Sequence, residues 1–427
     1  MKTQKIGIVL LALLLVAMVM VPMVSAEEQV DTLVSGGLID ANYVPIDTAY
    51  THAAFSLVEF ASMGAQDEKQ KWFGAIVNPR PIVINDLNGK KLFYLFSIER
   101  NNQKIGEIRI AANKVMGGSL ISIGTQNKSI EINSIEKHLQ AELRKNNAES
   151  ISKSQLVCYA YPKIGLVNQY SDPTTKIIKT IIVDAYDYSV IVNDHSNLNE
   201  KNHDFYSLYG LMGTEKYSSA INLWTQYAET VQSMLKMNPS LLPSSENPLS
   251  EQHLQLYIQN TQARTVTEYY VMGGVPLYSQ PNGLWCAVVT ARMISAKWNT
   301  YRSTDAIASK MGAGTAQYPV STNPQMELIY YRATIANGGL NKPQSDNYEL
   351  INWDDSKTEI NADRPFKVGN YDGHARAVIG YTRSPSSPYY TYFYIKDPAP
   401  INQGSEYWEW FNNLNPFFYN GHIKVRF

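Results

Sequence analysis

A pair of strand-like segments near the C-terminus limits the fold more than any other feature of this sequence. In residues 374–381, Ala, Ala, Ile and Tyr alternate with His, Arg, Val and Gly, which is the period of a β-strand. Residues 389–397 are rich in Tyr, Phe and Ile, and the Pro- and Ser-containing stretch 383–388 between the two segments is typical of a turn. The sequence therefore predicts an antiparallel hairpin.

This hairpin predicts a contact between a histidine and a carboxylate. If Tyr381 pairs with Tyr390, then His374 lies directly opposite Asp397. Opposed residues of an antiparallel pair have Cβ atoms about 4.5–5.5 Å apart, so Asp397 can accept a hydrogen bond from one imidazole nitrogen and orient the other. A register shifted by one residue would place the two side chains on opposite faces.

The second cysteine of the chain, Cys286, follows a Pro-Asn-Gly turn and opens an apolar run that ends at Trp298. This pattern predicts a buried helix with the cysteine in its first turn. The positive end of a helix dipole favours the thiolate, which is the nucleophilic form of cysteine. Taken alone, Cys286 is better explained as a buried structural residue, because free cysteines are commonly buried.

Four residues together predict covalent acyl transfer. Cys286 would be the nucleophile, His374 the general base and Asp397 the group that orients the imidazole. Gln280 lies six residues before the cysteine, where its side-chain amide and the Cys286 N–H can face a developing oxyanion. Singly, Gln280 would be interpreted as a surface loop residue, but no structural explanation accounts for all four residues.

These residues resemble the motifs of papain-like cysteine peptidases, and within them staphopain and the bacteriocin-leader-processing peptidases. The resemblance covers about the last 155 residues and rests on Val275-Pro-Leu-Tyr-Ser-Gln280, Trp285-Cys286-Ala287, Asp372-Gly-His374-Ala and Lys396-Asp397-Pro398. It implies the same four roles for Gln280, Cys286, His374 and Asp397. It also implies a buried helix packed on an antiparallel sheet, and a peptide or protein substrate.

The sequence departs from the family pattern at two positions. Many members have Asn where this chain has Asp397, and a carboxylate there changes the charge of the pair with the histidine. Ala287 replaces the Gly that usually follows the nucleophile in the leader-processing peptidases. By the same resemblance, Trp408 or Trp410 would shield the His–Asp pair from water, with core packing as an equal alternative.

Residues 1–26 are predicted to be a signal peptide, so the protein is expected to be secreted or extracytoplasmic. Lys2 and Lys5 precede an apolar run over residues 6–21, and the small residues Val24-Ser25-Ala26 suit a cleavage site. The apolar run is long for a signal, which leaves an uncleaved membrane anchor as the alternative.

The rest of the chain is predicted to be α+β, in three parts. Residues 27–195 combine helices near 43–63 and 134–147 with strands near 81–85, 91–98, 105–110, 156–161 and 175–192. This part looks like the propeptide of a secreted papain-like zymogen, an intramolecular pro-domain that covers the cleft. Residues 196–265 form a helical connector and linker, and residues 266–427 form the peptidase domain. The Pro- and Ser-rich stretch 238–248 predicts an exposed linker, and cleavage is expected between Asn238 and Glu268.

Composition narrows the class of protein. The formal charge of −1, which becomes −3 without Lys2 and Lys5, gives no reason to expect a nucleic-acid partner. Two cysteines are too few for a disulfide scaffold. Cys158 is interpreted as a core residue of a strand, with a disulfide to Cys286 in the zymogen as the sharper alternative. Five histidines outside the hairpin are scattered without metal-ligand spacing, so no metal and no cofactor are expected: His52, His138, His195, His203 and His253.

Two other functions stay open at this point. One is a cell-wall amidase or a transglutaminase-like acyl transferase, because both use a cysteine, a histidine and a polar third residue. The other is a secreted binding protein whose peptidase domain is inert. The intact set of Cys286, His374 and Asp397 favours an enzyme, and Gln280 before the cysteine favours a peptidase.

Overall fold

The structure is a computed structural model that describes residues 37–63, 66–125, 129–193, 205–261, 268–348, 351–369, 374–383, 391–411 and 422–427. It divides into two compact units, residues 1–42 and residues 43–427, and the second unit holds every element discussed below. The predicted signal segment lies outside the described residues. Within those residues, no helix is long and apolar enough to cross a membrane.

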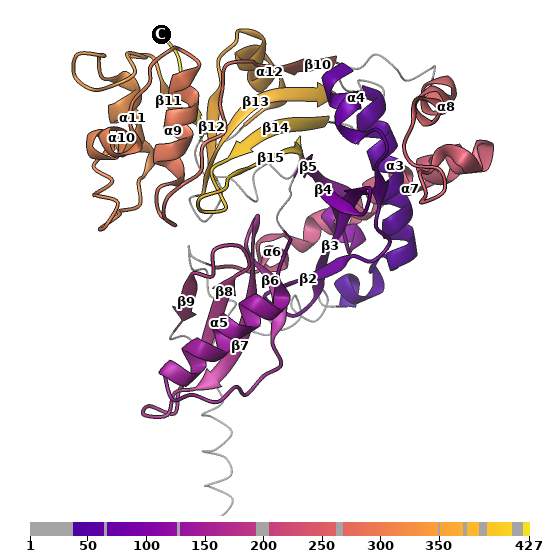
Figure 1. The fold of residues 1–427 in the computed structure, drawn as a ribbon, viewed down its shortest axis with the longest axis horizontal. Helices are drawn as coiled ribbons and strands as arrows, with labels where there is room; N and C mark the ends of the chain where they lie inside the picture. The colour runs from indigo at the N-terminus through magenta and orange to yellow at the C-terminus, as the bar shows by residue number, and fades with distance from the viewer. Residues whose placement is uncertain are drawn as a thin grey trace, which may run out of the picture. The chain divides into compact units, whose positions relative to one another are not determined.

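The first half of the larger unit contains helices and a strongly antiparallel set of strands (Figure 1). Its helices are α3 (Ile46–Met63), α4 (Gln66–Trp72) and α5 (Ile132–Lys145). Its strands are β1 (Ile76–Val77), β2 (Ile82–Asp86), β3 (Lys91–Arg100), β4 (Gln103–Ala111), β5 (Leu120–Thr125), β6 (Gln155–Ala160), β7 (Lys163–Ser171), β8 (Ile178–Asp184) and β9 (Val190–Asn193).

The connector is helical, and its ends are held in place. It contains α6 (Leu208–Leu211), α7 (Tyr217–Met237) and α8 (Glu251–Thr261). Residues 244–248 of the predicted linker are exposed, as expected. Leu241 and Leu249 on either side are buried, and Leu249 exchanges backbone hydrogen bonds with Gly74 and Ala75. The linker is therefore an exposed loop between two buried leucines, one of which is hydrogen-bonded to the first half of the chain.

The second half carries four α-helices and seven strands in its described residues. The helices are α9 (Cys286–Ala296), α10 (Thr304–Met311), α11 (Pro324–Arg332) and α12 (Trp353–Asn361), with the end of α8 just before them. The strands are β10 (Glu268–Val271), β11 (Asp346–Tyr348), β12 (Phe366–Gly369), β13 (Ala375–Arg383), β14 (Thr391–Asp397), β15 (Ser405–Trp410) and β16 (His422–Lys424). Helix α9 packs against β13 and β12.

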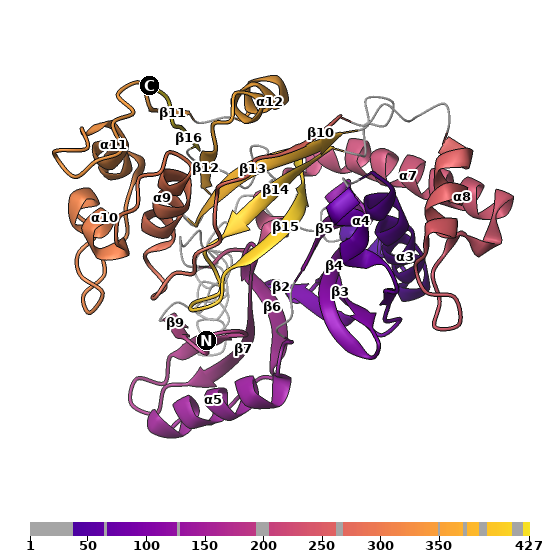
Figure 2. The same cartoon turned by 45° about the horizontal axis from the view of Figure 1, so that its top comes forward.

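One sheet runs through both halves. Its order is β11-β16-β12-β13-β14-β15-β5-β4-β3-β2-β6-β7-β8-β9, with β1 added to β3 and β10 to β13. The halves meet where β5 pairs antiparallel with β15, and Figure 2 shows the two strands side by side. Gly124 of β5 is required here, because a Cβ at this position would lie 2.5 Å from the Tyr407 Cβ.

The two halves also share one hydrophobic core. Trp408 of β15 packs on Phe60 of α3 with ring centroids 6.2 Å apart, and Trp410 packs over Gly118. The architecture is a mixed α and β fold with a large sheet and several helices, which is compatible with the predicted α+β class. The boundaries expected at residues 195 and 265 stay predictions.

The predicted helices correspond to α3 and α5 and the first four predicted strands to β2, β3, β4 and β6, whereas α4, β5 and β7 were not predicted. One predicted strand was too long: residues 175–192 divide into β8 and β9, because a turn at residues 185–187 separates them.

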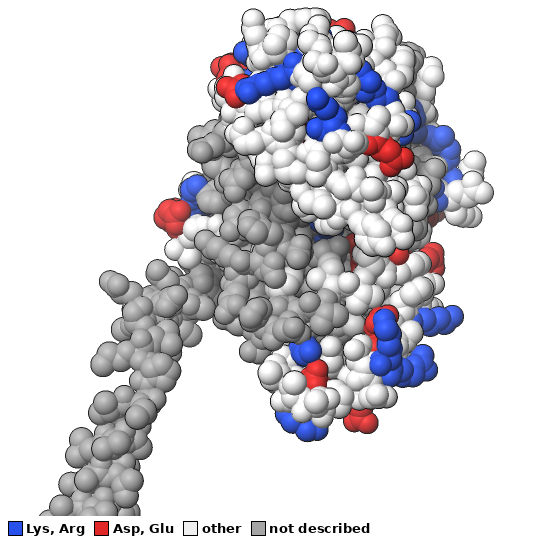
Figure 3. All heavy atoms as spheres, turned by 90° about the vertical axis from the view of Figure 1, so that its left-hand side faces the viewer, with Lys and Arg blue, Asp and Glu red and all other residues white. Residues whose placement is uncertain are grey.

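On the face shown in Figure 3, described acidic and basic side chains are interspersed, in keeping with the near-zero formal charge.

Candidate active site

Cys286 is the first residue of α9, the position that the sequence predicted. Trp285 fixes the start of the helix, since its indole Nε1 donates a hydrogen bond to the Ala313 carbonyl at 2.8 Å. One turn later, the Thr290 hydroxyl donates to the Ala375 carbonyl at 3.0 Å. This bond joins the helix that carries Cys286 to the residue that follows His374. Cys286 as a residue is 8% exposed and lies in a small buried cluster with Ala287 and Ala375.

His374 and Asp397 are in contact, although the assumed register was wrong. His374 Nε2 lies 2.7 Å from Asp397 Oδ1, and both side chains are buried. Tyr381 pairs with Phe393 instead of Tyr390, which lies outside the described residues, and a bulge after Val378 changes the register before the strand start. Asp397 is thus displaced by two residues from direct opposition. An even displacement keeps both side chains on one face, so a diagonal contact replaces the opposed one.

The imidazole has a defined orientation. Because Nε2 faces Asp397, Nδ1 is the nitrogen left for the Cys286 thiol, with which His374 forms a hydrogen bond. Asp397 is held in turn by the Ala399 N–H, which donates to Oδ1 at 2.8 Å, and by the Tyr407 hydroxyl, which donates to Oδ2 at 2.9 Å. The carboxylate therefore accepts bonds on both oxygens.

Gln280 is attached through its backbone to the loop that follows Asp397. Its N–H donates to the Pro398 carbonyl at 2.9 Å, and its carbonyl accepts from the Asn402 N–H at 3.0 Å. The side chain is only 3% exposed, and its Oε1 has no hydrogen-bond partner within the described part of the chain. Gln280 is thus a buried residue beside the acid, and the surface-loop interpretation of it was wrong.

Charge separation between the thiol and the imidazole is favoured. Burial raises the pKa of Cys286, but the hydrogen bond and charge of His374 outweigh burial and lower that pKa below its ordinary value. Burial lowers the pKa of His374, but the charge and hydrogen bond of Asp397, with a contribution from Cys286, raise it to about 9. The pKa of Asp397 is lowered, because His374 and Arg376 together outweigh the effect of burial. These shifts favour the thiolate, the imidazolium and the ionised carboxylate over the neutral forms of the three groups.

A buried polar network behind Asp397 was missed by sequence reasoning. Arg376 Nη1 donates to the Tyr407 hydroxyl oxygen at 2.8 Å and to the Glu409 Oε1 and Oε2 atoms at 2.9 and 3.0 Å. Tyr161, from the first half of the chain, donates its hydroxyl hydrogen to Glu409 Oε1 at 2.6 Å. Hydrogen bonds therefore lead from the first half to Asp397.

Strand alternation was the one signal that could have found part of this network. Arg376 is two residues after His374, so the predicted strand places both on one face. Trp408 and Trp410 alternate with Tyr407 and Glu409 and so point to the opposite face of β15, where they belong to the core. Trp408 and Trp410 are therefore core residues, which is the second of the two predicted roles, and neither of them shields the His374–Asp397 pair.

Cys158 is a buried free thiol on β6, and Cys286 is also a free thiol. The structure therefore contains no disulfide between Cys158 and Cys286. Cys158 is buried in a strand, as the interpretation of it as a core residue predicted.

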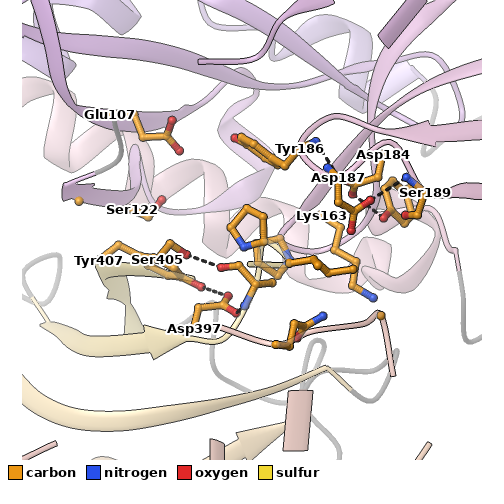
Figure 4. Close-up of a pocket in the computed structure, with 18 of the residues that line it drawn as sticks. Glu107, Ser122, Lys163, Asp184, Tyr186, Asp187, Ser189, Asp397, Ser405 and Tyr407 are labelled. Carbon is orange, nitrogen blue, oxygen red and sulfur yellow. Dashed lines mark hydrogen bonds between the residues drawn. The ribbon is translucent and has the colours of Figure 1, made fainter. Parts of the chain in front are cut away.

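A cavity of about 390 Å³ opens beside the site, between strands of both halves (Figure 4). Tyr407, Ser405 and Asp397 form one wall, and Lys163 at the start of β7 faces them from the other side. Gln280 lines the cavity as well. The positive charge of Lys163 makes a small contribution to the lowered pKa of Cys286, after those of His374 and the Ala375 backbone.

The match with a known protein family lies in the second half of the chain. No curated protein matches the sequence. Residues 272–419 match the model of the Peptidase_C39 like family, a stretch that is less than half of the chain and includes Gln280, Cys286, His374 and Asp397. This match supports a cysteine peptidase-like domain in residues 272–419.

Proposed function

We propose that this protein is an exported cysteine endopeptidase made as a zymogen, with Cys286, His374 and Asp397 as its catalytic triad. The observation that carries the proposal is the orientation of one imidazole: Nε2 contacts Asp397 at 2.7 Å, and the ring hydrogen-bonds the thiol at the first turn of α9. A nucleophile, a base and an orienting group arranged in this way can perform covalent acyl transfer.

The proposed reaction proceeds through a thioester. The Cys286 thiolate attacks the peptide carbonyl carbon, and the Gln280 amide and the Cys286 N–H stabilise the oxyanion. The His374 imidazolium then donates its proton to the leaving amine, so the C–N bond breaks and the acyl group stays on sulfur. Water hydrolyses the thioester with neutral His374 as the base, which restores the thiol and releases the acid.

The test of this function uses the chain from Glu27 onward under reducing conditions, beside a Cys286→Ala version. The parent is expected to hydrolyse unfolded casein and to react once, at Cys286, with an epoxysuccinyl-type thiol reagent, whereas Cys286→Ala does neither. Casein left intact by a correctly folded parent, with no labelling at neutral pH, would contradict the proposal. Turnover of cell-wall peptides in place of casein would favour the amidase alternative.

The zymogen part of the proposal rests on the exposed loop of residues 244–248 between buried Leu241 and Leu249. Exposed loops with irregular backbone are the usual sites of proteolytic cutting. The parent is expected to yield a fragment that begins between Asn238 and Glu268, and Cys286→Ala to stay intact. A parent that hydrolyses casein yet never shortens would refute processing and leave the peptidase proposal standing.

The pH dependence of the reaction follows from the two opposite pKa shifts. The active ion pair is lost on the acid side as the thiolate takes up a proton, and on the alkaline side as His374 loses its proton near pH 9. Because Asp397 raises the pKa of His374, Asp397→Asn is expected to move the alkaline limb of kcat/KM to lower pH. An alkaline limb that does not move in Asp397→Asn would show that this carboxylate does not set the imidazole pKa.

A further inference from the structure

One buried cation in the cavity lacks a hydrogen-bonding acceptor. Arg109 on β4 lines the cavity and is 7% exposed. Its guanidinium carbon lies 5.5 Å from the ring centroids of Phe93 and of Tyr161. Among the described residues, Nε has no hydrogen-bond partner, and no carboxylate forms an ion pair with the group. A buried guanidinium without an acceptor is costly, so the position suits an anion that enters from outside.

Acidic residues that line the same cavity are engaged elsewhere. Glu107, two residues before Arg109, pairs with Lys104 at 3.1 Å. Glu406 on β15 pairs with Lys396 at 3.2 Å. The charge of Glu107 also acts on Arg109 and contributes to the raised pKa of that guanidinium, but among the described residues the ion pair of Glu107 is with Lys104.

Asp397 is held by His374, Ala399 and Tyr407, and two further acids of the cavity lie at the end of β8 and in the turn after it. Asp184 accepts hydrogen bonds from the Tyr159 hydroxyl at 2.8 Å and from the backbone N–H of Tyr186 at 2.8 Å. Asp187 accepts from the Ser189 N–H at 2.7 Å. These carboxylates have partners that shape the turn, and none of them is Arg109.

The position of Arg109 on the sheet connects it with the proposed triad. Arg109 pairs with Ser122 on β5, and Ser122 pairs with Glu409 on β15. Paired residues point to the same face, so Arg109 and Glu409 share a face. Asp397 pairs with Ser405, which is an even number of positions from Glu409 and shares that face. Gln280 and Asp397 line the cavity together with Arg109, whereas Cys286 and His374 do not, so a peptide bound in the cavity would lie beside the proposed triad.

We propose that Arg109 binds a carboxylate of the peptide substrate and so sets the specificity of the enzyme. This inference rests on the proposed function. A planar guanidinium with its outer nitrogens toward the cavity can hold a carboxylate through two parallel hydrogen bonds, and Lys163 adds a second positive charge at the cavity wall. The carboxylate is either the C-terminus of the substrate or an Asp or Glu side chain.

A second consequence concerns the first half of the chain. Arg109 and Lys163 both belong to it, so the first half must remain in the active enzyme. The β5–β15 ladder and the shared core join the halves without the linker, and a cut between Asn238 and Glu268 leaves these contacts intact. The processed enzyme is therefore a complex of two fragments.

The test measures binding to the full chain with Cys286→Ala, which cannot turn over. Three fluorescent octapeptides of otherwise identical neutral sequence serve as probes: one amidated, one with a free C-terminal carboxylate, and one amidated with an internal Glu that is moved along the peptide. One of the two acidic probes is expected to bind roughly tenfold or more tightly than the neutral amide. The better of the two identifies the source of the carboxylate.

Adding Arg109→Met is expected to remove the preference for the acidic probe and to leave the affinity for the neutral amide within about twofold. Arg144→Met, at an exposed position on α5, is the matched control and should keep the preference. Arg109→Gln is used in the same binding measurement if Arg109→Met does not fold. An equal affinity for all three probes, or a preference that survives the loss of Arg109, overturns the proposal. Because binding is measured without turnover, an inactive parent would refute the peptidase and leave this result unaffected.

Discussion

Replacing His374 with alanine is expected to lower kcat/KM for peptide hydrolysis by at least about 10⁴-fold, as loss of a triad base does in other hydrolases. His374 has two functions in the proposed reaction. It holds Cys286 as a thiolate through a hydrogen bond and a positive charge, and it supplies the proton for the leaving amine. Alanine removes both, while Gln280 and Asp397 stay in place.

The same substitution should change the thiol itself. Burial alone raises the pKa of Cys286, and His374 provides the main opposing interactions. Without the imidazole, the pKa of the thiol is therefore expected to rise above its present value, and alkylation by iodoacetamide at neutral pH should slow. The rate is followed against pH in a Cys158→Ala background, so that Cys286 is the only thiol that reacts.

His138→Ala is the matched control for this experiment. His138 is exposed on α5, where its ring stacks on Tyr188, and it should leave both activity and the alkylation profile unchanged. If His374→Ala keeps more than a tenth of the activity, or if the alkylation profile does not move, then His374 is neither the base nor the partner of the thiol.

That a carboxylate of the second strand faces His374 could be predicted from the sequence, but only through an assumed register, which is wrong by three residues at Tyr381 and by two residues at the start of the strand. The exact register could not, since it depends on a bulge after Val378 that no residue type in this segment indicates. The contact survived the error because the displacement was an even number of residues. The helix start at Cys286 was predictable for a similar reason: the Pro-Asn-Gly turn and the apolar run are both local signals.

The arrangement of the sheet could not be predicted, because it depends on contacts between distant parts of the chain. Gly124 of β5 fits closely against β15, a contact between distant residues that no local pattern indicates. The alternation in Leu120-Ile-Ser-Ile123 could have predicted the strand itself, which was not assigned. Tyr161 and Glu409 are separated by 248 positions, and nothing local marks them as partners. The buried position of Gln280 depends in the same way on the loop after Asp397.

Replacing Glu409 with alanine is expected to lower the free energy of unfolding by about 3–5 kcal/mol, the usual cost of breaking a buried ion pair on one side. Glu409 and Arg376 are both 0% exposed, and the guanidinium meets both carboxylate oxygens. Alanine would leave Arg376 charged and buried, and would also remove the acceptor of the Tyr161 hydroxyl. Urea unfolding of the full chain, followed by tryptophan fluorescence, measures the loss.

A double-mutant cycle separates the cost of an unpaired charge from the loss of packing. In Arg376→Met with Glu409→Leu, both charges are replaced by apolar side chains of similar size, so most of the stability lost in Glu409→Ala should return. Tyr161→Phe removes only the hydroxyl from the first half and is expected to cost less than Glu409→Ala, although it leaves one Glu409 oxygen with a bond fewer. If Glu409→Ala were as stable as the parent, the remaining partners of Arg376, Tyr407 among them, would be sufficient to satisfy its charge. The connection between the first half and the proposed triad would then lie in the β5–β15 ladder and not in the polar network.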